Sequence, residues 1–414
     1  MKVLSFTLVY PNPREPGLGL FVQARLQELG RLTELKVVAP VATLDYSNPN
    51  GKRFRRRDVP LTRTKEQVEV LYPRWIYPPG GTPVNVLCLA ARLFGLFLRV
   101  RKTFPFELLD VHFGYPEGVA GALLAWAFGV PFVVTLRGSE PVFAGYRRRR
   151  LCLQWALRRA DAVIAVSEDL RCFAIELGTP AERASTITNG VDTNVFFPRD
   201  REACRARLGL PAAMRLIVCA GELIEAKGHH LAIQAVADLV SAGLDVSLVI
   251  AGGVARGGPR YDAHLRSLIA RLGMEKRIRL AGAVGRDELA ELLTAADVFT
   301  LPSYREGCPN VINEALACGT PVVATAVGAV PQLIPSEDYG FIVEPGRQEP
   351  LTAALARAIN KPWDRTAISV WGSRRSWKAV AQELMDVLRP VLDVRQHNAL
   401  QSESLVQPAP VEKN

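Results

Sequence analysis

Several patterns that mark common binding sites are missing from this sequence of 414 residues. Its seven cysteines are Cys88, Cys152, Cys172, Cys204, Cys219, Cys308 and Cys318. They are scattered, odd in number and nowhere spaced as C-x-x-C, so we expect buried thiols in a reducing compartment rather than a zinc site or a disulfide framework. No G-x-G-x-x-G and no P-loop sequence occurs, which argues against a dinucleotide or ATP site.

A membrane-spanning segment is not expected either. Residues 118–136 carry no charge and are long enough to cross a bilayer, but Gly129-Val130-Pro131 would break a helix there. This stretch is therefore predicted to be a helix, a turn and a buried strand. The N-terminal sequence MKVLSFTLVYPNP has no small-residue cleavage site, so we interpret it as a first buried strand rather than a signal peptide.

Charge is distributed unevenly along the chain. The net charge is +10, yet residues 1–210 hold 30 Lys and Arg against 19 Asp and Glu, so the whole excess lies in the first half. Two runs concentrate it, residues 52–57 and Arg147 to Arg150. Three explanations compete: a solvated face, nucleic-acid binding, or attraction to anionic lipid.

Length and periodicity predict two α/β domains built on parallel sheets. Short apolar runs alternate with helical periods, break in a polar stretch at 198–211 and then restart. The predicted strands of the first half are VLSFTLVY, LKVVAP, LLDVHF, PFVVTL and AVIAVS, and those of the second half are RLIVCAGEL, VSLVIAGG, RIRLAG, DVFTLP and PVVATAV. We therefore predict domains over 1–198 and 211–370, a helix over 371–393 and a disordered tail over 394–414.

The sequence YREGCPNVINEALACGTPVVA, residues 304–324, is the first candidate site. Glu306 is predicted to lie in a loop that leaves a buried strand, and Glu314 one turn into a helix that starts near Pro309-Asn310 and stops at Gly319. Ligands of open α/β sheets gather at that end of the strands, and carboxylates accept hydrogen bonds from vicinal sugar hydroxyls. The alternative is that Glu314 only caps its own helix and Glu306 is solvated.

Two weaker candidates follow other predicted strands. Lys227 precedes Gly228 at a helix start, a combination that suits a diphosphate. Gly17 and Gly19 would let the backbone approach a phosphate closely. A solvated lysine and ordinary turn glycines are the alternatives.

Together these pieces resemble the GT-B glycosyltransferases, specifically family 4 of the retaining, nucleotide-sugar-dependent enzymes. The resemblance covers roughly residues 1–392 and is strongest in REGCPNVINEALACGTPVVAT, VGAVPQLI and GFIVEPG. VSEDL, NGVDTNVFFP, Lys227-Gly228 and VHFGYPEG match as well. It implies two Rossmann-like domains that face a central cleft, with the nucleotide sugar mainly on the second, the acceptor mainly on the first, and a C-terminal helix that crosses back to the first.

The resemblance also implies roles for individual residues. Glu314 would hold the ribose hydroxyls, Lys227 would neutralise the leaving diphosphate, and Gly19 would lie against it. Glu306 would hold the donor sugar together with amides of the next loop. That loop consists of Cys308, Pro309, Asn310 and Val311. On the acceptor side the matching residues are His112, Ser139 and Glu140.

Two positions depart from the family pattern. Many members have Gly-Arg where this chain has Gly221-Glu222, a carboxylate that would repel a diphosphate. Many have His-Gly-Ser-Asp where it has an Arg at position 137, followed by Gly-Ser-Glu. We predict that Arg137 acts as a catalytic cation beside Glu306 and Lys227, with Arg256 or Arg260 as a second substitute for the missing arginine.

The predicted activity is retaining transfer of a hexose-like unit from a nucleotide-diphosphate sugar to a glycan or lipid-linked saccharide, in bacterial cell-surface or exopolysaccharide synthesis. Family members typically need no metal, this chain has no D-x-D sequence, and no cofactor is expected beyond the co-substrate. The alternatives are a catalytically inactive nucleotide-sugar or glycan-binding protein and a nucleotide-sugar epimerase.

The predicted location is the cytoplasm, at the inner face of the membrane. Both basic runs flank an amphipathic stretch over 86–104, in which Leu and Phe alternate with basic residues. Such a surface suits peripheral binding to anionic lipid. Nucleic acid is not expected as a partner, because no nucleic-acid module accompanies the charge.

Overall fold

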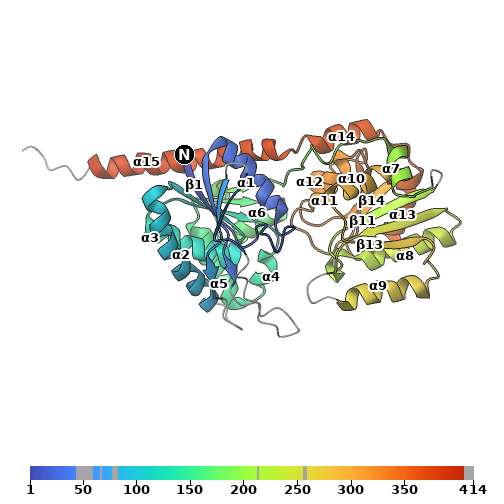
Figure 1. Cartoon of the computed structure of the whole chain (residues 1–414), viewed down its shortest axis with the longest axis horizontal. Helices are drawn as coiled ribbons and strands as arrows, with labels where there is room; N and C mark the ends of the chain where they lie inside the picture. The colour runs from blue at the N-terminus through green and yellow to red at the C-terminus, as the bar shows by residue number, and fades with distance from the viewer. Residues whose placement is uncertain (43–58, 66–67, 77–82, 212–213, 255–258, 405–414) are drawn as a thin grey trace, which may run out of the picture.

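Two large, mainly parallel β-sheets, each covered by helices on both faces, lie side by side (Figure 1). The computed structural model describes residues 1–42, 59–65, 68–76, 83–211, 214–254 and 259–404. The basic run at 52–57 lies outside the described residues. The predicted fold class, α/β with two Rossmann-like domains, is confirmed by this architecture.

The first sheet has the strand order β10-β9-β8-β7-β1-β2-β5-β4 and is parallel except for the β4–β5 pair. Its central strands β7 and β8 are buried along their whole length and mostly apolar, as expected of strands covered on both faces. The strands are β1 (Lys2–Phe6), β2 (Glu34–Val38), β4 (Thr62–Lys65), β5 (Val68–Leu71), β7 (Leu108–His112), β8 (Phe132–Leu136), β9 (Ala162–Ala165) and β10 (Ala184–Thr186). Two short strands, β3 (Val41–Ala42) and β6 (Arg74–Trp75), pair separately.

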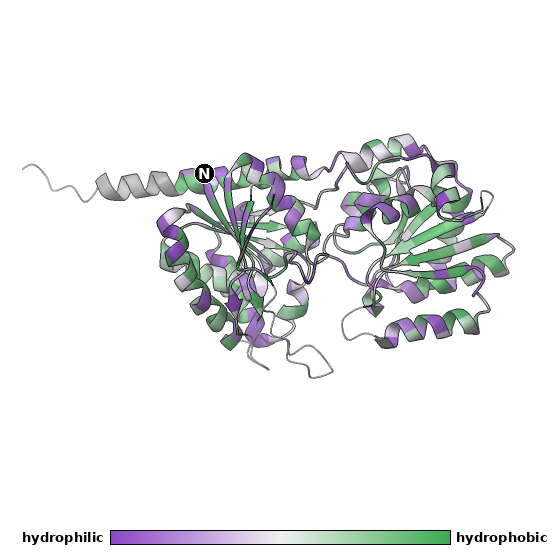
Figure 2. Ribbon diagram, in the orientation of Figure 1, coloured by the Kyte–Doolittle hydropathy of each residue, from purple (hydrophilic) through white to green (hydrophobic). Residues whose placement is uncertain are grey.

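The second sheet is parallel throughout, in the order β13-β12-β11-β14-β15-β16. Its strands are β11 (Arg215–Ala220), β12 (Val246–Ala251), β13 (Ile278–Gly282), β14 (Val298–Leu301), β15 (Val322–Thr325) and β16 (Gly340–Val343). All ten strands predicted from the sequence are present. Figure 2 shows that the strands of this sheet are hydrophobic while the helices around them are mixed.

The helices alternate with the strands along the chain. Those of the first half are α1 (Leu20–Leu32), α2 (Pro83–Thr103), α3 (Val119–Phe128), α4 (Glu140–Ala144), α5 (Arg147–Arg159) and α6 (Glu168–Glu176). Those of the second half are α7 (Arg201–Arg207), α8 (His229–Ser241), α9 (Pro259–Arg271), α10 (Arg286–Ala295), α11 (Asn310–Ala317), α12 (Val330–Leu333), α13 (Gln348–Asn360), α14 (Arg365–Ser373) and α15 (Trp377–Ser404).

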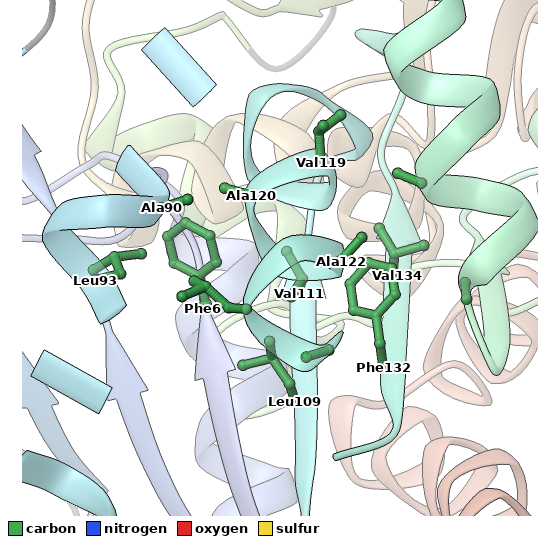
Figure 3. Packing of buried hydrophobic residues seen from close by; sticks show 14 of the residues in the cluster. Phe6, Ala90, Leu93, Leu109, Val111, Val119, Ala120, Ala122, Phe132 and Val134 are labelled. Atoms are coloured by element: carbon green, nitrogen blue, oxygen red, sulfur yellow. The ribbon is translucent and has the colours of Figure 1, made fainter. Parts of the chain in front are cut away.

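Each sheet has a hydrophobic core on either face. In the first sheet, one core joins the strands to α2, α3 and α5, and Figure 3 shows its centre, where Phe6 and Val111 meet Leu93 and Ala120. The opposite core joins the strands to α1 and α15. In the second sheet, α8, α9 and α13 cover one face and α10, α11 and α14 the other.

The uncharged stretch at 118–136 folds as predicted. It forms α3, a turn in which Gly129 has φ +64°, and the buried strand β8. No helix in the part of the chain that the structure describes is both long and apolar enough to cross a membrane.

The C-terminal helix crosses back to the first domain, as the resemblance implied (Figure 1). Where one helix was predicted over 371–393, α14 ends at Ser373 and α15 runs from Trp377 to Ser404, so that α15 includes part of the tail predicted to be disordered. Trp377, Leu384 and Leu388 are buried against the first domain. The domain limits at 198 and 211 stay predictions.

Candidate active site

The predicted donor loop lies at the carboxyl end of the second sheet. Strand β14 ends at Leu301, and α11 begins at Asn310 with Pro309 as its cap and ends before Gly319, whose φ is +75°. This is the loop-to-helix arrangement predicted from the sequence. The free N–H groups at the start of α11 make this edge suited to oxygen-rich, anionic ligands.

Lys227 and Glu306 form an ion pair in this loop. The Lys227 Nζ lies 2.6 Å from the Glu306 Oε1, and the Ser303 hydroxyl donates to the same oxygen over 2.7 Å. The Glu306 side chain is 9% exposed and that of Lys227 23% exposed. The structure thus brings together two predicted site residues that are 79 positions apart in the chain.

A glycine makes this approach possible. Lys227 ends the turn η3 (Glu225–Lys227), and Gly228 follows with φ +67°. A Cβ at Gly228 would lie 2.0 Å from the Pro302 carbonyl oxygen, so a larger residue would push η3 away from the donor loop. Gly228 is therefore needed for steric reasons, and Lys227 supplies the charge that pairs with Glu306.

Glu314 lies on the side of α11 that faces a cavity of about 760 Å³ between the two domains. Burial raises the pKa of this carboxyl to about 7; the charge of Arg286 opposes the rise and that of Asp192 adds to it. Gly17 lines the same cavity from the first domain. The structure therefore places Glu314 and one of the two predicted glycines around one space.

Gly19 is the N-cap of α1 and has φ +69°. A Cβ there would lie 2.4 Å from the Val9 carbonyl oxygen, so the turn into α1 needs a glycine. Its sequence-predicted role against a phosphate stays a prediction.

Arg137 does not extend into open space. It lies in the loop after β8, is 8% exposed, and has its guanidinium 5.2 Å from the centre of the Phe21 ring. Its Nη2 and Nε lie 2.8 and 3.3 Å from the His112 Nδ1, and its Nη1 donates to the Asn189 Oδ1 over 3.2 Å. Arg137 was predicted to be a catalytic cation of the cleft; the structure shows a buried cation held by His112 and Asn189, and the catalytic role stays a prediction.

His112 is fully buried beneath Arg137. Its Nε2 lies 3.1 Å from the Asp110 Oδ2, and its Nδ1 faces the Arg137 guanidinium. Burial lowers the pKa of His112 to about 4, against the opposing effect of Asp110, so the ring is neutral at pH 7. A neutral ring with Nδ1 as acceptor and Nε2 as donor satisfies both neighbours.

Glu140 holds the backbone of the same loop. Its side chain is fully buried, and its two oxygens accept hydrogen bonds from the backbone N–H groups of Gly114, Arg137 and Gly138, at 2.8 to 3.2 Å. The neighbouring Ser139 hydroxyl is buried without a hydrogen-bond partner in the described part of the chain. Acceptor contacts of His112, Ser139 and Glu140 stay predictions, and the structure adds a supporting task for Glu140.

A second buried carboxyl, Glu117, was not singled out from the sequence. It accepts the Leu8 N–H over 3.3 Å and so ties the loop after β1 to the turn that follows β7. Burial raises its pKa to about 8, so this carboxyl is mostly protonated at neutral pH.

Asn189 connects the two sides of the site, and sequence reasoning did not single it out. It belongs to the matched NGVDTNVFFP segment, yet no role followed from its position. Its Nδ2 donates to the Asn310 Oδ1 over 2.9 Å, and its carbonyl oxygen accepts from the Asn313 Nδ2 over 3.0 Å. Asn189 therefore connects Arg137 of the first domain to the first turn of α11.

The two departures from the family pattern are placed differently. Glu222 is exposed at the end of β11, and no ion pair of its side chain is found within the described ranges. Arg260 is exposed at the start of α9, while Arg256 lies outside the described residues. The structure brings neither Arg260 nor Arg137 into an ion pair with Glu222.

Comparison with known proteins identifies the two halves. Residues 18–195 match the family model described as Glycosyltransferase Family 4, and residues 200–378 match the one described as Glycosyl transferases group 1. A D-inositol 3-phosphate glycosyltransferase of Saccharomonospora viridis is 34% identical over 314 residues, 72% of this chain and 73% of the relative. The putative teichuronic acid biosynthesis glycosyltransferase TuaC of Bacillus subtilis is 29% identical over 370 residues, 86% of this chain and 89% of the relative.

Solved structures show the same fold. Sucrose-phosphate synthase from Thermosynechococcus elongatus superposes with a TM-score of 0.77 at 20% identity, over 95% of this chain and 99% of that one. Anabaena HepE in complex with UDP and glucose superposes with a TM-score of 0.66 at 22% identity, over 97% of this chain and the whole of the other. Two matched family models, relatives above 30% identity and this shared architecture give one conclusion: the chain belongs to the GT-B glycosyltransferases of family 4 and is a glycosyltransferase that uses nucleotide-sugar donors.

Proposed function

We propose that this glycosyltransferase transfers its sugar with retention of configuration and without a divalent metal, to a glycan or lipid-linked saccharide in bacterial cell-surface synthesis. The observation that carries the proposal is the Lys227–Glu306 pair beside the start of α11. It puts one cation, one carboxylate and free backbone amides at the same edge of the second sheet.

Each group has a step to perform. As the sugar departs, negative charge develops on the leaving diphosphate, and the Lys227 ammonium and the amides at the start of α11 stabilise it. Glu306 accepts hydrogen bonds from hydroxyls of the donor sugar and keeps Lys227 in place until the donor arrives. No residue of this set has to form a covalent bond to the sugar, because the acceptor hydroxyl attacks the anomeric carbon on the face from which the diphosphate departs, and the leaving phosphate accepts the hydroxyl proton.

Retention and metal independence are tested together. Nucleotide sugars with uridine, guanosine or adenosine are incubated with the protein and an acceptor extract, with and without EDTA. Release of nucleoside diphosphate that EDTA does not reduce, together with a product whose anomeric coupling constant matches that of the donor, supports the proposal. An inverted product or an EDTA-sensitive rate refutes it, and conversion of the donor without transfer would indicate an epimerase.

The acceptor class is proposed from the relatives' names and from the first domain. TuaC is named for teichuronic acid biosynthesis, whereas the D-inositol 3-phosphate glycosyltransferases are named for a small polyol phosphate. We favour the polymer or its lipid-linked precursor for this chain, because its first domain presents a surface suited to a membrane.

That surface is the outward face of α2 with its neighbours α3 and α5. On α2, Val84, Leu87, Phe94 and Leu98 recur on one side of the helix and are 42–59% exposed. Trp126 at the end of α3 is 82% exposed and Leu151 of α5 57% exposed. The basic residues around them are exposed too: Arg92, Arg99, Arg101, Lys102, Arg147, Arg148 and Arg150.

Arg149 is the exception in this basic run. Its guanidinium lies 4.6 to 5.7 Å from the ring centres of Tyr115, Phe143 and Tyr146, so it is part of the protein's own packing. Arg101 likewise lies over the rings of Phe106 and Phe128. The other exposed cations would meet anionic headgroups, at about 1 kcal/mol each, while the apolar side chains would enter the interface.

Vesicle binding tests the membrane part. We expect the wild-type protein to sediment with vesicles of anionic phospholipid at low salt, and to be released when Arg147, Arg148 and Arg150 are changed to Gln. The matched control neutralises three exposed cations of the second domain, Arg271, Lys276 and Arg279. Failure of the wild type to bind anionic vesicles at low salt contradicts this proposal and leaves a soluble acceptor.

A further inference from the structure

The two domains meet backbone to backbone at a pair of glycines. Gly138, in the loop after β8, has φ +114°, and a Cβ placed on it would lie 2.8 Å from the Gly307 Cα. A Cβ on Gly307 would lie 2.2 Å from the Arg137 carbonyl oxygen. No side chain separates the donor loop from the first domain at this point, so any shift of one backbone displaces the other.

A chain of side-chain hydrogen bonds runs beside this contact. It starts at the buried pair of Asp110 and His112, passes through the Arg137 guanidinium to the Asn189 Oδ1, and continues from the Asn189 Nδ2 to Asn310. Asn310 is the first residue of α11, and the N–H of Asn189 points at the Cys308 sulfur over 3.4 Å. The chain therefore reaches the donor loop from a fixed point inside the first domain.

We propose that Asn189 is a positioning residue of the transfer reaction, which together with Arg137 holds the donor loop and the start of α11 against the first domain. The inference rests on the proposed role of that loop in holding the donor sugar. In this arrangement Asn189 touches neither substrate, and it acts by fixing where Glu306 and the backbone amides of Cys308, Asn310 and Val311 present the sugar to the acceptor.

The chemistry of the two side chains suits this task. An asparagine carries one acceptor and one donor on a short arm, so it can join a cation on one side to an amide oxygen on the other. The planar guanidinium of Arg137 contacts His112 and Asn189 at once, which a single ammonium cannot do in the same geometry. This gives Arg137 a role that does not depend on contact with the diphosphate.

Kinetics provide the first test. Asn189→Ala and Arg137→Ala are each expected to lower kcat by about 10- to 100-fold, because a loop misplaced by an ångström impairs the reaction. The dissociation constants for UDP, GDP and ADP, measured by calorimetry, should change less than about twofold, since Lys227 and Glu314 are untouched. The nucleotide sugar used is the one that gives the fastest nucleotide release with the wild type.

The double variant tests whether Arg137 and Asn189 act as one hydrogen-bonded unit or independently of each other. If Arg137 acts through Asn189, Arg137→Ala with Asn189→Ala should be no slower than the slower single variant by more than about twofold. If the rate losses of the two single variants multiply in the double variant, the proposal is wrong. Arg137→Lys should recover less than a tenth of the lost rate, and full recovery would show that only the positive charge matters.

Hydrogen exchange supplies a readout that does not need turnover. We expect the hydrogen-bonded amides of α11, Glu314 to Ala317, to exchange about tenfold faster in Asn189→Ala and in Arg137→Ala, with no change in the strands β11 and β12. The control is Asn360→Ala, whose amide bonds only within its own helix at the Ala356 carbonyl. Unchanged exchange rates of the α11 amides in both variants would contradict the proposal that Asn189 and Arg137 hold this helix in place.

A backbone variant tests the contact with every side chain intact. Gly307→Ala must move the donor loop away from Arg137, and we expect it to lower kcat as much as Asn189→Ala does. A wild-type kcat in Gly307→Ala contradicts the proposal. If neither the wild type nor any variant turns over a nucleotide sugar, the proposed function is wrong. The exchange experiment still tests whether Asn189 and Arg137 hold α11 in place.

Discussion

The donor side and the first-domain side of this site are built in different ways. On the donor side, a single stretch from Ser303 to Glu314 supplies a loop, a helix start and two carboxylates, and Lys227 joins it from the turn before α8. On the first-domain side, Asp110 and His112 come from β7 and Arg137 from the loop after the adjacent strand β8, and all three are nearly or fully buried. The first arrangement presents groups to a ligand, and the second mainly holds other parts of the protein.

The difference teaches that a position matched to a family motif need not present its side chain to a ligand. Glu306 and Glu140 are both carboxylates that follow the end of a strand, Glu306 in a loop and Glu140 at the start of α4. Glu306 is paired with a partly exposed lysine, whereas Glu140 binds three backbone N–H groups with no exposed surface. A change at the former should therefore affect turnover, and a change at the latter should affect stability.

The largest expected effect is on the donor side. Glu306→Gln keeps the size of the side chain but removes the charge that pairs with Lys227, and we expect kcat to fall by about 100-fold or more while the melting temperature is unchanged. Nucleotide release from the preferred nucleotide sugar measures it. Glu344→Gln, at an exposed site of the same domain, is the control. Wild-type turnover in Glu306→Gln would contradict the donor-site assignment.

At Glu140 we expect a change to reduce stability rather than turnover. Glu140→Ala leaves the N–H groups of Gly114, Arg137 and Gly138 buried without an acceptor, so the free energy of unfolding should fall by about 2 to 4 kcal/mol. Thermal unfolding followed by circular dichroism measures the loss, with the exposed Glu182→Ala as control. If Glu140→Ala unfolds like the wild type but loses turnover, then Glu140 belongs with Glu306 and the comparison fails.

The donor side of the site could be predicted from the sequence to a greater extent than the first-domain side. The spacing of Glu306 and Glu314, the flanking Pro309 and Gly319, and the preceding buried strand define a loop-to-helix element locally, and the structure has it. The pairing of Lys227 with Glu306 depends on how two βα loops meet at the sheet edge. Periodicity within either segment carries no information about that contact.

On the first-domain side, the strands were predictable and the side-chain directions were not. The apolar runs over 108–113 and 131–136 predict β7 and β8, because strands buried on both faces need them. The edge strand β4, with the sequence TRTK, has no such run and was missed. Arg137 was predicted to be a cleft cation, but its contacts with His112 and Asn189 could not be predicted, because the direction of a long side chain depends on its tertiary neighbours.

A smaller effect is expected from pH at Glu314. Its carboxyl has a pKa of about 7 in the free protein, raised mainly by burial, so it is largely protonated below that pH and ionised above it. The ionised form accepts ribose hydroxyls better, and protons compete with nucleotide as the pH falls. Affinity for the preferred nucleoside diphosphate should therefore rise by about three- to tenfold between about pH 6 and pH 8. Calorimetric titrations measure it, and Glu314→Gln should remove the dependence; a dependence that survives in Glu314→Gln assigns it to another group.

The smallest expected effect concerns Glu222, which distinguishes this donor side from that of many relatives. Glu222 is exposed at the end of β11, so its repulsion of a bound diphosphate is weakened by solvent. Glu222→Arg replaces this repulsion with attraction and should tighten nucleoside diphosphate binding by only about two- to fivefold, with a larger gain at low salt than at high salt. Glu225→Arg, exposed in the adjacent turn, is the matched control for the change in net charge. Equal tightening in both variants would mean that the affinity for nucleoside diphosphate depends on the net charge of this region and not on position 222. Weaker binding in Glu222→Arg would show instead that the carboxylate contacts the donor directly, which would make the donor side, like the first domain, dependent on a residue that the family pattern does not predict.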